Sequence, residues 1–491
     1  MTQKRYYYLK LTTALLALAA LCAVATRTNV FAAGPLDEGS SSVKPSPVQF
    51  QTKFGSLTFP EKFPDGTTLS ITQWSHFVPL YDKWFDQYAQ DWGKANNVKV
   101  TVQHISYADL NSTLAAAIAA NSGPTLVQMN ATPAAFIQGL QSLNDVNEAA
   151  EATYGKGVDP CTHQAYLPIK QEWYAYCVGW VVDPGDYRIS LWKDAGYPEG
   201  PVTYDDLYNG GVKIFQKTGI PVGVGMSPEI DSEFYARSLI WSFGGQIEDA
   251  CGEVTLDSPE VIDAVKYQAK LFHGAETPEV FSWNAASNNQ AFVSGRASYI
   301  QNSISFYRTA QESNPKNAAD TGFRPGLKGS TGKVHQTAHV WFIYVLPKYV
   351  TNKNQIDAAK KFMLDLTANY SSDTYYSKLY DFPAYAPTVP QLEQKAGWID
   401  HDPWGSEPPN KLSVMRGALA WTAWLGYPGY ANPATSEIYN TFLLSTMMAQ
   451  AARDEKTPEQ AVKDTAAQMQ QIVEKWKKLG FVGCGREAGG K

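Results

Sequence analysis

Hydrophobic and polar positions follow two alternating periods over the first third of the chain. Residues 67–74 (TTLSITQW) and 98–105 (VKVTVQHI) alternate with a period of two, which predicts strands, and residues 125–129 (TLVQM) predict a short third strand. Between them, a helix is expected from Pro79, with large aromatic side chains at helical spacing, and an Ala-rich helix over 109–121. This alternation predicts α/β layers around a mainly parallel sheet.

The same alternation returns later in the chain. Residues 257–272 carry helix-start chemistry around Pro259, and Thr457 opens a last long helix with the spacing of a capping box. Residues 340–347 (VWFIYVLP) predict a buried strand, and 353–368 predict an amphipathic helix after it. The sequence contains no internal repeat, so we expect one α/β assembly with more than one core.

The composition of the chain argues against nucleic acid as a partner. Of the 491 residues, 18% are charged and the net charge is −6, without a cluster of Lys and Arg that would suit phosphate. Nucleic acid is therefore not expected as a partner. The 14 Trp and 28 Tyr are more informative, because their amphipathic rings suit binding surfaces as well as cores.

The N-terminus has the layout of a secretory signal peptide. Basic residues precede an apolar run over 11–24, and small residues follow near position 32. We therefore expect residues 1–32 to be a cleaved signal and the protein to be periplasmic or extracellular, with an uncleaved anchor or a lipid anchor at Cys22 as the alternative. Residues 33–65, rich in Ser, Pro and Gly, are expected to form a flexible lead-in, and 481–491 a C-terminal tail.

Four cysteines remain beyond the signal, an even number that suggests disulfides in an oxidising compartment. The favoured pair is Cys161 with Cys177, because a short loop and a strand separate them. The sequence leaves open the other pairings of these two with Cys251 and Cys484, and also four free thiols.

Motifs for catalysis are weak. The sequence has no nucleophile elbow, phosphate-binding loop or H-E-x-x-H motif. His335 and His339 are four residues apart, but no carboxylate lies between them, so neither a metal site nor a cofactor is expected. A secreted glycoside-acting enzyme remains an alternative, because paired carboxylates could come from Glu172, Asp183, Glu229, Asp231 and Glu233.

Six stretches, in order, resemble the extracellular solute-binding proteins of bacterial ABC importers, in particular the sugar-binding group that includes maltose-binding protein. They lie between residues 66 and 480, and they include "LNSTLAAAIAANSGPTLVQM", "AYLPIKQEWYAYCVGWVVDP", "LIWSFGGQIEDACGEVTLDSPEVIDAVKYQAKLF" and "NNQAFVSGRASYIQNS". The remaining two are the later strand with its helix and "TPEQAVKDTAAQMQQI".

The resemblance implies an α/β, two-lobed periplasmic-binding-protein fold of type II, with the ligand between lobes joined by crossover strands. It implies a first lobe of 66–170 and 302–349, and a second of 171–301 and 350–480. The implied function is capture of a small polar solute by lobe closure and its delivery to the permease subunits of an ABC transporter, without catalysis. A solute receptor that does not serve transport is the other alternative.

The resemblance also implies the ligand-binding residues. The positions that match the family's cleft are Trp74, His76, Asn130, Thr132, Glu172, Trp173, Tyr174, Glu233, Tyr235, Trp241, Asn302, His339, Trp341 and Tyr385. This chain departs from the maltose-binding group near Asn130, where that group has an acidic residue, which weakens maltose itself as the solute. Aromatic faces beside Glu, Asn and His favour a sugar or another polyol, while Arg308 and Arg324 leave room for an anion.

Overall fold

The structure is a computed structural model that describes residues 44–485. Its larger sheet has six strands, in the order β14 (Asp381–Pro383), β8 (Tyr176–Val181), β13 (Trp341–Val345), β5 (Leu126–Met129), β3 (Thr68–Trp74) and β4 (Lys99–Ile105). Strands β3, β4 and β5 are parallel, whereas β13 pairs antiparallel with both β5 and β8, and β14 pairs antiparallel with β8. The expectation of a mainly parallel sheet is therefore wrong for half of it. Strands β8, β13 and β14 join the sheet antiparallel to their neighbours, and antiparallel neighbours do not require a helical crossover.

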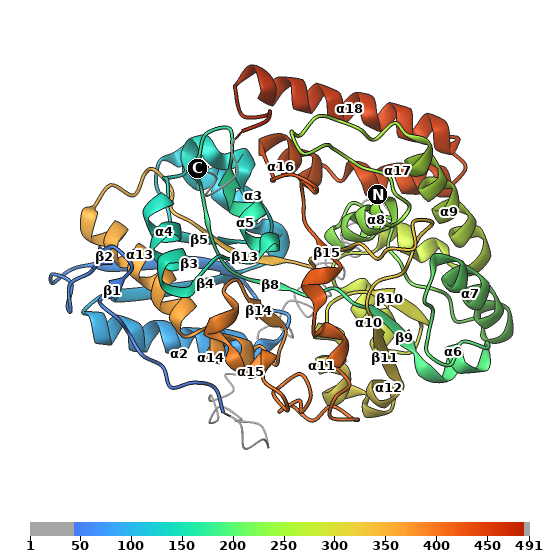
Figure 1. Cartoon of the computed structure of the whole chain (residues 1–491), viewed down its shortest axis with the longest axis horizontal. Coiled ribbons are helices and arrows are strands. Elements are labelled where there is room, and N and C mark those ends of the chain that lie inside the picture. Colours follow the sequence, from blue (N-terminus) through green and yellow to red (C-terminus); the bar gives the residue numbers. More distant parts are fainter. Residues whose placement is uncertain (1–43, 486–491) are drawn as a thin grey trace, which may run out of the picture. The chain divides into compact units, whose positions relative to one another are not determined.

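Helices cover this sheet, as the sequence predicted for its first half. Helix α2 (Pro79–Asn96) packs on β4, α3 (Leu110–Ala120) on β5, and α5 (Asp159–Ala165) on β8. Figure 1 shows α2 and α14 (Tyr370–Tyr376) along one side of the strands, where the two helices contact each other. Pro79 occupies the first turn of α2, where a missing N–H costs nothing, and Asn97 ends the helix in the left-handed conformation.

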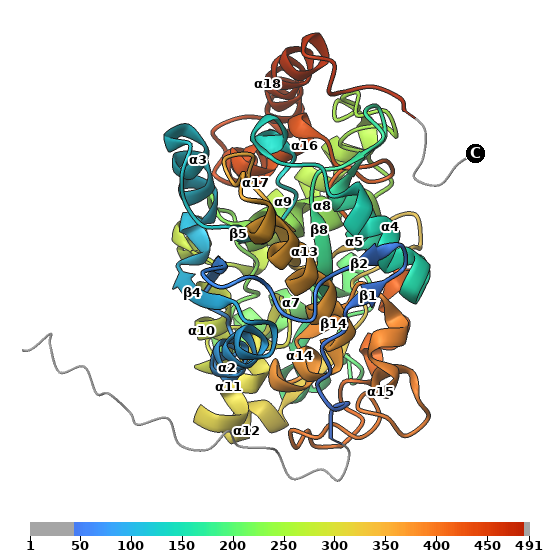
Figure 2. The same ribbon diagram turned by 90° about the vertical axis from the view of Figure 1, so that its left-hand side faces the viewer.

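The described part of the lead-in is packed. Strands β1 (Lys53–Phe54) and β2 (Leu57–Thr58) form a hairpin beside α4 (Asn144–Tyr154), as Figure 2 shows from the side. Phe54, Phe59 and Phe63 are buried. The backbone N–H groups of Gln49 and Gln51 donate to the side chains of Asn369 and Asp365, both at 2.8 Å. The prediction of a flexible lead-in is therefore wrong for residues 44–65, because aromatic burial outweighs the Ser/Pro/Gly composition. The predicted signal peptide lies outside the described residues.

A smaller sheet organises the rest. Strand β9 (Gly185–Arg188) pairs antiparallel with β10 (Tyr299–Gln301) and β11 (Thr321–Arg324). Helix α6 (Ile189–Asp194) packs on β9. Helices α7 (Tyr204–Thr218), α8 (Ile230–Ser242), α9 (Pro259–Ala275), α17 (Leu443–Ala452) and α18 (Pro458–Lys478) pack on one another, with α9 in contact with the other four. The predicted starts of α9 and α18 are confirmed, since the side chains of Ser258 and Thr457 accept from backbone N–H groups in the first turns.

Two hydrophobic cores result, and they divide the chain differently from the expected lobes. The first core takes most of its residues from 54–182 and 338–425, and the second from 187–280 and 423–482. Helix α13 (Lys353–Ala368) and strand β14 belong to the first core, which corrects the assignment of all of 350–480 to the second lobe. Strand β8 also lies in the larger sheet, so the first crossing falls after Val181 rather than at residue 171.

Short elements complete the described chain. They are η1 (Tyr107–Asp109), η2 (Ala134–Gly139), β6 (Tyr166–Leu167), β7 (Glu172–Trp173), η3 (Pro278–Ser282), α10 (Ser287–Val293), α11 (Ser305–Ser313), α12 (Pro315–Ala319), β12 (Gln336–Thr337), η4 (Ala386–Thr388), α15 (Pro390–Glu393), η5 (Ser413–Met415), η6 (Ala418–Ala420), β15 (Thr422–Ala423) and α16 (Pro433–Asn440). Disulfides join Cys161 to Cys177, the pair that the sequence favoured, and Cys251 to Cys484. Within residues 44–485, no helix has the length and apolar character to span a bilayer.

Candidate functional site

The carboxyl ends of the three parallel strands supply the first side chains of the site. Trp74 is the last residue of β3, Tyr107 follows β4 by two residues, and Asn130 follows β5 directly. Because parallel strands end at the same edge of a sheet, these residues are brought together there. In open α/β sheets this edge is the usual place for a ligand.

Aromatic side chains from both halves of the chain meet the strand ends. Together with Asp231, seven aromatic or imidazole side chains form what we call the aromatic site: Trp74, His76, Tyr107, Phe234, His339, Tyr380 and Tyr439.

One side of the aromatic site comes from the first core. The Trp74 ring lies 5.4 Å from the Tyr107 ring, edge to face, and stacks on His76 at 4.9 Å between centroids. His76 in turn meets the edge of Tyr380 at 4.9 Å. Tyr380 immediately precedes β14, so this side is held by two strands of the larger sheet.

The other side comes from α8, α16 and the segment before β13. Phe234 stacks on Tyr439 at 5.7 Å and lies 5.6 Å from His339, whose ring is 6.5 Å from Tyr380. Tyr107, which packs on Trp74, has its pKa raised by burial and then by the nearby Tyr439. Rings from the larger sheet and from helices α8 and α16 therefore meet in one region, which belongs to the first core.

Several polar atoms of the aromatic site lack a partner. The indole N–H of Trp74, the hydroxyls of Tyr107, Tyr380 and Tyr439, and Oδ1 of Asp231 are buried without a hydrogen bond to any residue in the described chain. Trp74 and Tyr380 are each 1% exposed, Tyr439 is 3% exposed and Asp231 is 8% exposed. A buried donor or acceptor without a partner costs about 1–3 kcal/mol, so a concentration of them indicates a place for a ligand or water.

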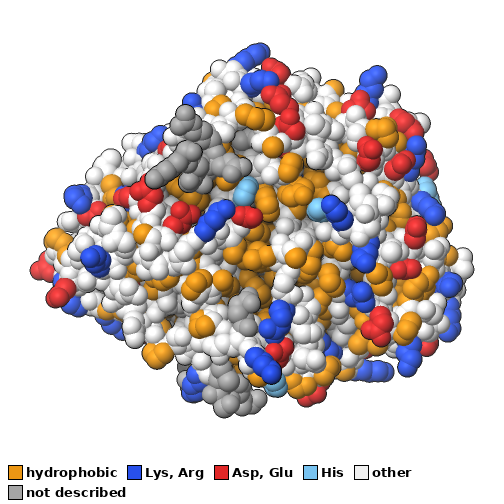
Figure 3. Space-filling view, viewed as in Figure 1, with side chains coloured by type: hydrophobic (Ala, Val, Ile, Leu, Met, Phe, Trp, Pro, Cys, Tyr) orange, Lys and Arg blue, Asp and Glu red, His pale blue; other side chains and the backbone are white. Residues whose placement is uncertain are grey.

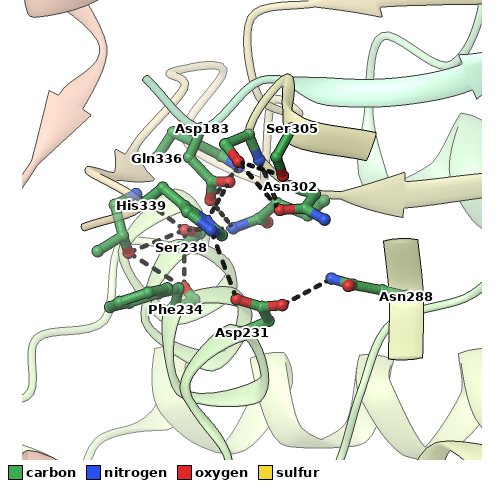
Figure 4. Close-up of polar contacts among 12 residues, drawn as sticks. Asp183, Asp231, Phe234, Ser238, Asn288, Asn302, Ser305, Gln336 and His339 are labelled. Carbon is green, nitrogen blue, oxygen red and sulfur yellow. Dashed lines mark hydrogen bonds and ion pairs between the residues drawn. The ribbon is translucent and has the colours of Figure 1, made fainter. Parts of the chain in front are cut away.

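His339 connects two buried carboxylates (Figure 4). Its Nδ1 is 3.1 Å from Oδ1 of Asp183, and its Nε2 is 3.8 Å from Oδ1 of Asp231. Burial opposes protonation, but the hydrogen bond to Asp183 and the charge of Asp231 outweigh it, so the pKa of His339 is raised. The protonated ring can donate from both nitrogens.

Amides hold the two carboxylates in place. Gln301 donates to Oδ2 of Asp183 at 2.7 Å, and Asn288 donates to Oδ2 of Asp231 at 2.8 Å (Figure 4). Burial, and then the nearby Glu229, raise the pKa of Asp231 well above its ordinary value. Oδ1 of Asp231 is thus the oxygen that remains without a hydrogen bond while the rest of the carboxylate is fixed.

The start of α8 places Asp231 in the site. Glu229 is the N-cap residue, and its carboxylate accepts from the backbone N–H groups of Asp231 and Ser232 at 2.8 and 2.6 Å. Burial raises the pKa of Glu229 to about 7 despite these hydrogen bonds. The cap therefore fixes the first turn of α8, and Phe234 follows Asp231 on the next turn.

His76 is held as a neutral ring. The backbone N–H of Val78 donates to its Nδ1 at 2.9 Å, so its Nε2–H points to Asp381 at 3.0 Å. Burial lowers the pKa of His76 to about 4. This histidine therefore acts as a flat surface under Trp74 rather than as a charge.

Asp183 and His339 also lie on the segments where the chain passes between the two sheets. Asp183 separates β8 from β9, and His339 separates β12 from β13. The backbone N–H of His339 donates to Val181 at 2.9 Å, and that of Val181 donates to Val340 at 3.0 Å. The two crossing segments are thus bonded to each other beside the aromatic site.

The structure brings together only part of the residue set expected from the sequence. Trp74, His76 and His339 belong to the aromatic site, and Asn130 lies at the same sheet edge. Asn302 donates to Asn289, and it follows Gln301, the partner of Asp183. Ligand binding by these residues remains a prediction, and the structure places them in one part of the molecule.

The other nine expected residues are not members of the aromatic site. Thr132 and Tyr174 share a hydrogen bond of 2.9 Å, and Glu233 pairs with Arg237 inside α8. Trp173 packs on Tyr166, Tyr235 near Tyr204 in the second core, Trp241 against Tyr427, and Tyr385 between Tyr154 and Tyr176. Trp341 donates through its indole N–H to the carbonyl of Pro160, and its ring lies 6.2 Å from that of Phe234, so it borders the aromatic site. Glu172 sits half-buried in β7, and its carboxylate makes no hydrogen bond or ion pair with residues 44–485.

Sequence reasoning missed Tyr107, Phe234, Tyr380 and Tyr439 as site residues. For Tyr107 a signal existed, because it follows the second predicted strand as Trp74 ends the first. Asp183 and Asp231 were considered only as a catalytic pair. Phe234 and Tyr439 carry no local signal, because distant segments bring them to the site.

Two further observations bear on alternative sites. An apolar hollow of about 280 Å³ lies beside β14, lined by side chains such as Trp180, Phe382 and Leu419, but it offers few polar groups. Among the residues that the structure describes, no group of three His, Cys, Asp or Glu could hold a metal ion. The aromatic site is therefore the best candidate.

Comparisons with known proteins agree with this geometry. Residues 87–404 match the family described as bacterial extracellular solute-binding protein. A binding protein of Brucella abortus (strain 2308) is 28% identical over 112 residues, 22% of this chain and only 27% of the Brucella protein. The chain thus matches well under two thirds of that relative's length.

Solved structures share the fold over a much longer stretch. Maltose-bound MalE3 of T. maritima superposes with a TM-score of 0.67 at 19% identity, covering 83% of this chain and 100% of that protein. The GacH receptor of Streptomyces glaucescens, solved with acarbose, gives 0.66 at 17% identity, with 83% and 99% covered. A sugar transporter protein of Arthrobacter chlorophenolicus A6 with bound laminaribiose gives 0.67 at 14% identity, with 82% and 99% covered. With its two sheets, its two cores and the family match over residues 87–404, the chain belongs to the bacterial extracellular solute-binding proteins and has their two-lobed α/β fold.

Proposed function

We propose that this protein is the extracytoplasmic substrate-binding component of an ABC transporter. It captures a small polyhydroxylated solute, a sugar or short oligosaccharide, at the aromatic site and delivers it to permease subunits in the membrane. In this proposal the chain reaches its location through a cleaved signal peptide. On the face shown in Figure 3, Lys and Arg are interspersed with Asp and Glu, which suits a partner other than nucleic acid.

The proposal of a sugar as the solute rests on one observation. Flat rings and unpartnered hydrogen-bonding atoms occur together, from Trp74, Tyr107, Tyr380, Tyr439 and Asp231. A sugar presents apolar C–H faces for the rings and hydroxyls that both donate and accept, so it would satisfy these atoms at once. The sugar ligands of MalE3 and GacH, named above, support the same solute class.

Closure of the two lobes would complete the site. Tyr439 on α16 lies among first-core residues, and α16 makes further contacts across to that core. Ser436 donates to the carbonyl of Thr132 at 2.9 Å, and Asn111 donates to Asn440 at 2.9 Å. A solute that contacts both sides would favour this closed arrangement, and it can do so only through its better contacts in that state.

A thermal-shift screen of the full protein tests the proposal. Sugars, amino sugars, polyols, amino acids and inorganic anions are added one at a time. A ligand present at 100 times its dissociation constant stabilises by about 2.7 kcal/mol, which gives a clear rise in melting temperature. Small-angle scattering of the best binder should then show a smaller radius of gyration.

Two outcomes would contradict the proposal. Stabilisation by amino acids or anions, without stabilisation by any sugar or polyol, would exclude a sugar as the solute. Turnover of a chromogenic glycoside, lost in Asp231→Asn, would favour a carboxylate-based glycoside enzyme instead.

A further inference from the structure

His339 is held by a hydrogen bond at only one of its two ring nitrogens. Its Nδ1 lies 3.1 Å from Oδ1 of Asp183, and the other oxygen of that carboxylate accepts from Gln301 at 2.7 Å and from Gln336 at 3.4 Å (Figure 4). His339 is 2% exposed and Asp183 is 1% exposed. Both oxygens of Asp183 are therefore occupied, and the carboxylate is shielded from water.

The fold fixes Asp183 from several directions. It lies between β8 and β9, where the chain passes from the larger to the smaller sheet. Its partners come from the end of β10, from β12 and from the segment before β13. Because Nδ1 of His339 is bound to this fixed carboxylate, Nε2 is the nitrogen that faces away from it. Asp183 thus determines the direction of Nε2 from the opposite side of the imidazole.

The second ring nitrogen of His339, Nε2, faces a carboxylate oxygen across a gap. Oδ1 of Asp231 is 3.8 Å away, which is longer than a hydrogen bond, and it has no hydrogen bond to any of residues 44–485. Asn288 holds the other oxygen of Asp231 at 2.8 Å. The imidazole also borders the rings of Phe234 and Tyr380, at 5.6 and 6.5 Å between centroids. One oxygen atom about 2.8 Å from both Nε2 and Oδ1 fits between them without movement of either group.

The chemistry of the two groups favours a hydroxyl in this gap. Burial opposes protonation of His339, but the hydrogen bond to Asp183 and the charge of Asp231 outweigh it, so the pKa of His339 is raised and Nε2 can donate. Burial and then Glu229 raise the pKa of Asp231 well above its ordinary value, so this carboxyl can also hold a proton. A hydroxyl both donates and accepts, so it satisfies Nε2 and Oδ1 in either protonation state of Asp231. An ammonium has only donors and could not accept from Nε2–H.

We propose that His339 and Asp231 together bind one hydroxyl group of the solute, and that Asp183 is the positioning residue for His339. This inference rests on the proposed function, in which the aromatic rings take the apolar faces of a sugar. It adds the group of the sugar that the site recognises, and a residue that affects recognition without touching the solute.

Calorimetry on the full protein, with sugars that lack one hydroxyl group, tests the inference. The sugar that binds most tightly among D-glucose, D-galactose, D-mannose, maltose, cellobiose and laminaribiose is compared with each of its singly deoxygenated forms. At one position, loss of the hydroxyl leaves Nε2 and Oδ1 buried without a partner, so affinity should fall about tenfold or more. We call this ratio of affinities the deoxy penalty at that position.

Two variants assign the deoxy penalty to residues. His339→Phe removes the Nε2 donor. Asp183→Asn replaces one acceptor oxygen with a donor, so the side chain can no longer accept from His339 and both glutamines. Each variant should lower the penalty at that position to about threefold or less and leave the penalties at other positions unchanged. A merely structural defect would instead weaken every form of the sugar alike.

Asp186→Asn is the matched control. Asp186 is also a buried carboxyl group, on the neighbouring strand β9, but it makes no contact with His339. This variant should keep every deoxy penalty of the wild type. The wild-type series by itself can overturn the inference, even where a variant does not fold.

The outcomes separate this inference from the function on which it rests. If no singly deoxygenated form binds more than about threefold more weakly, the inference is overturned and sugar capture stands. A full penalty in His339→Phe would assign the hydroxyl to other residues, and a full penalty in Asp183→Asn would remove the positioning role, so either result overturns the inference. Binding of none of the six sugars would remove the proposed function and this inference together.

Discussion

Two regions of this protein place aromatic rings beside a carboxylate, and they differ in whether their polar atoms have partners. In the β6–β7 hairpin, the Tyr174 hydroxyl donates to the carbonyl of Gln164 at 2.7 Å, and the Trp173 backbone N–H donates to Asn144 at 2.7 Å. In the aromatic site, the hydroxyls of Tyr380 and Tyr439 have no partner within residues 44–485. Aromatic content is similar, so the two regions differ in the hydrogen-bond partners of their hydroxyl groups, and we propose that the aromatic site is the one that binds.

The same difference appears within two residues of helix α8. Glu233 has no exposed surface and pairs with Arg237, while Asp231 keeps one oxygen without a hydrogen bond. Removing one partner of a buried charge pair is strongly destabilising, whereas a buried carboxylate oxygen without a hydrogen bond can accept one from a ligand. The comparison can be tested on either side.

The largest effect is expected on the free energy of unfolding, when the carboxylate that has a partner, Glu233, is changed. Glu233→Gln would leave the Arg237 guanidinium buried without a counter-charge, and we expect the free energy of unfolding to fall by about 3–5 kcal/mol. Urea denaturation of the ligand-free protein measures this. The folded fraction should bind solute as the wild type does. A loss of affinity without loss of stability would move Glu233 into the binding region.

The N-cap of the same helix gives a pH-dependent effect. The pKa of Glu229 is raised by burial from 4.5 to about 7, so the unfolded chain loses this proton at lower pH than the folded protein. Its contribution to stability is therefore greatest below pH 4.5 and falls as the pH rises to about 7, by about 3 kcal/mol in total. Glu229→Gln should lack this fall in denaturation curves recorded across the same range. An identical pH dependence in both proteins would contradict the assignment.

The disulfide beside the hairpin tests the packed region. Cys161 and Cys177 are 16 residues apart, and replacing both with Ser should lower the free energy of unfolding by about 3 kcal/mol through the entropy of the unfolded chain. Solute affinity at low temperature should stay within twofold of the wild type. A tenfold weaker affinity would show that the hairpin region contributes to binding.

Much of the fold was accessible from the sequence because it depends on local patterns. The strand at 68–74, the helix that starts at Pro79 and the cap at Thr457 all follow from period and end chemistry within a few residues. The antiparallel strands β13, β8 and β14 were harder to place. Their partner strands lie about two hundred residues away in the sequence, and a buried apolar run does not indicate whether a strand pairs parallel or antiparallel.

The candidate site was accessible only at positions beside strands that match the family's cleft. Trp74 and His339 were identified through their places beside strands, whereas Phe234 and Tyr439 sit on helices and resemble core residues in sequence. Glu233 and Asp231 also look equivalent in sequence. Only the position of Arg237, one turn further along α8, and the packing of His339 separate their roles.

Removing single hydroxyls tests the binding region at finer scale. Tyr439→Phe deletes a buried hydroxyl that has no partner, so stability should be unchanged or slightly higher, while affinity for the best solute falls about tenfold, or about 1.4 kcal/mol. Tyr235→Phe is the matched control, because its hydroxyl is also buried without a hydrogen bond in the described chain but lies in the second core. Calorimetry should show no change for the control. Equal losses in both would mean that unpartnered hydroxyls do not mark the site.

The smallest effect is expected at Glu172, where the comparison is sharpest. Its position in the resemblance implies a ligand contact, yet the structure places it half-buried in β7, opposite Leu167, without a bond to the aromatic site. Glu172→Ala should therefore change affinity by less than twofold, or about 0.4 kcal/mol, because no contact with the solute is lost. Titration of the best solute against this variant and against Asp231→Asn compares the two carboxylates directly. A tenfold loss at Glu172 would instead mean that the hairpin reaches the solute, and that hydrogen-bond partners in the closed arrangement are a poor guide to which aromatic region binds.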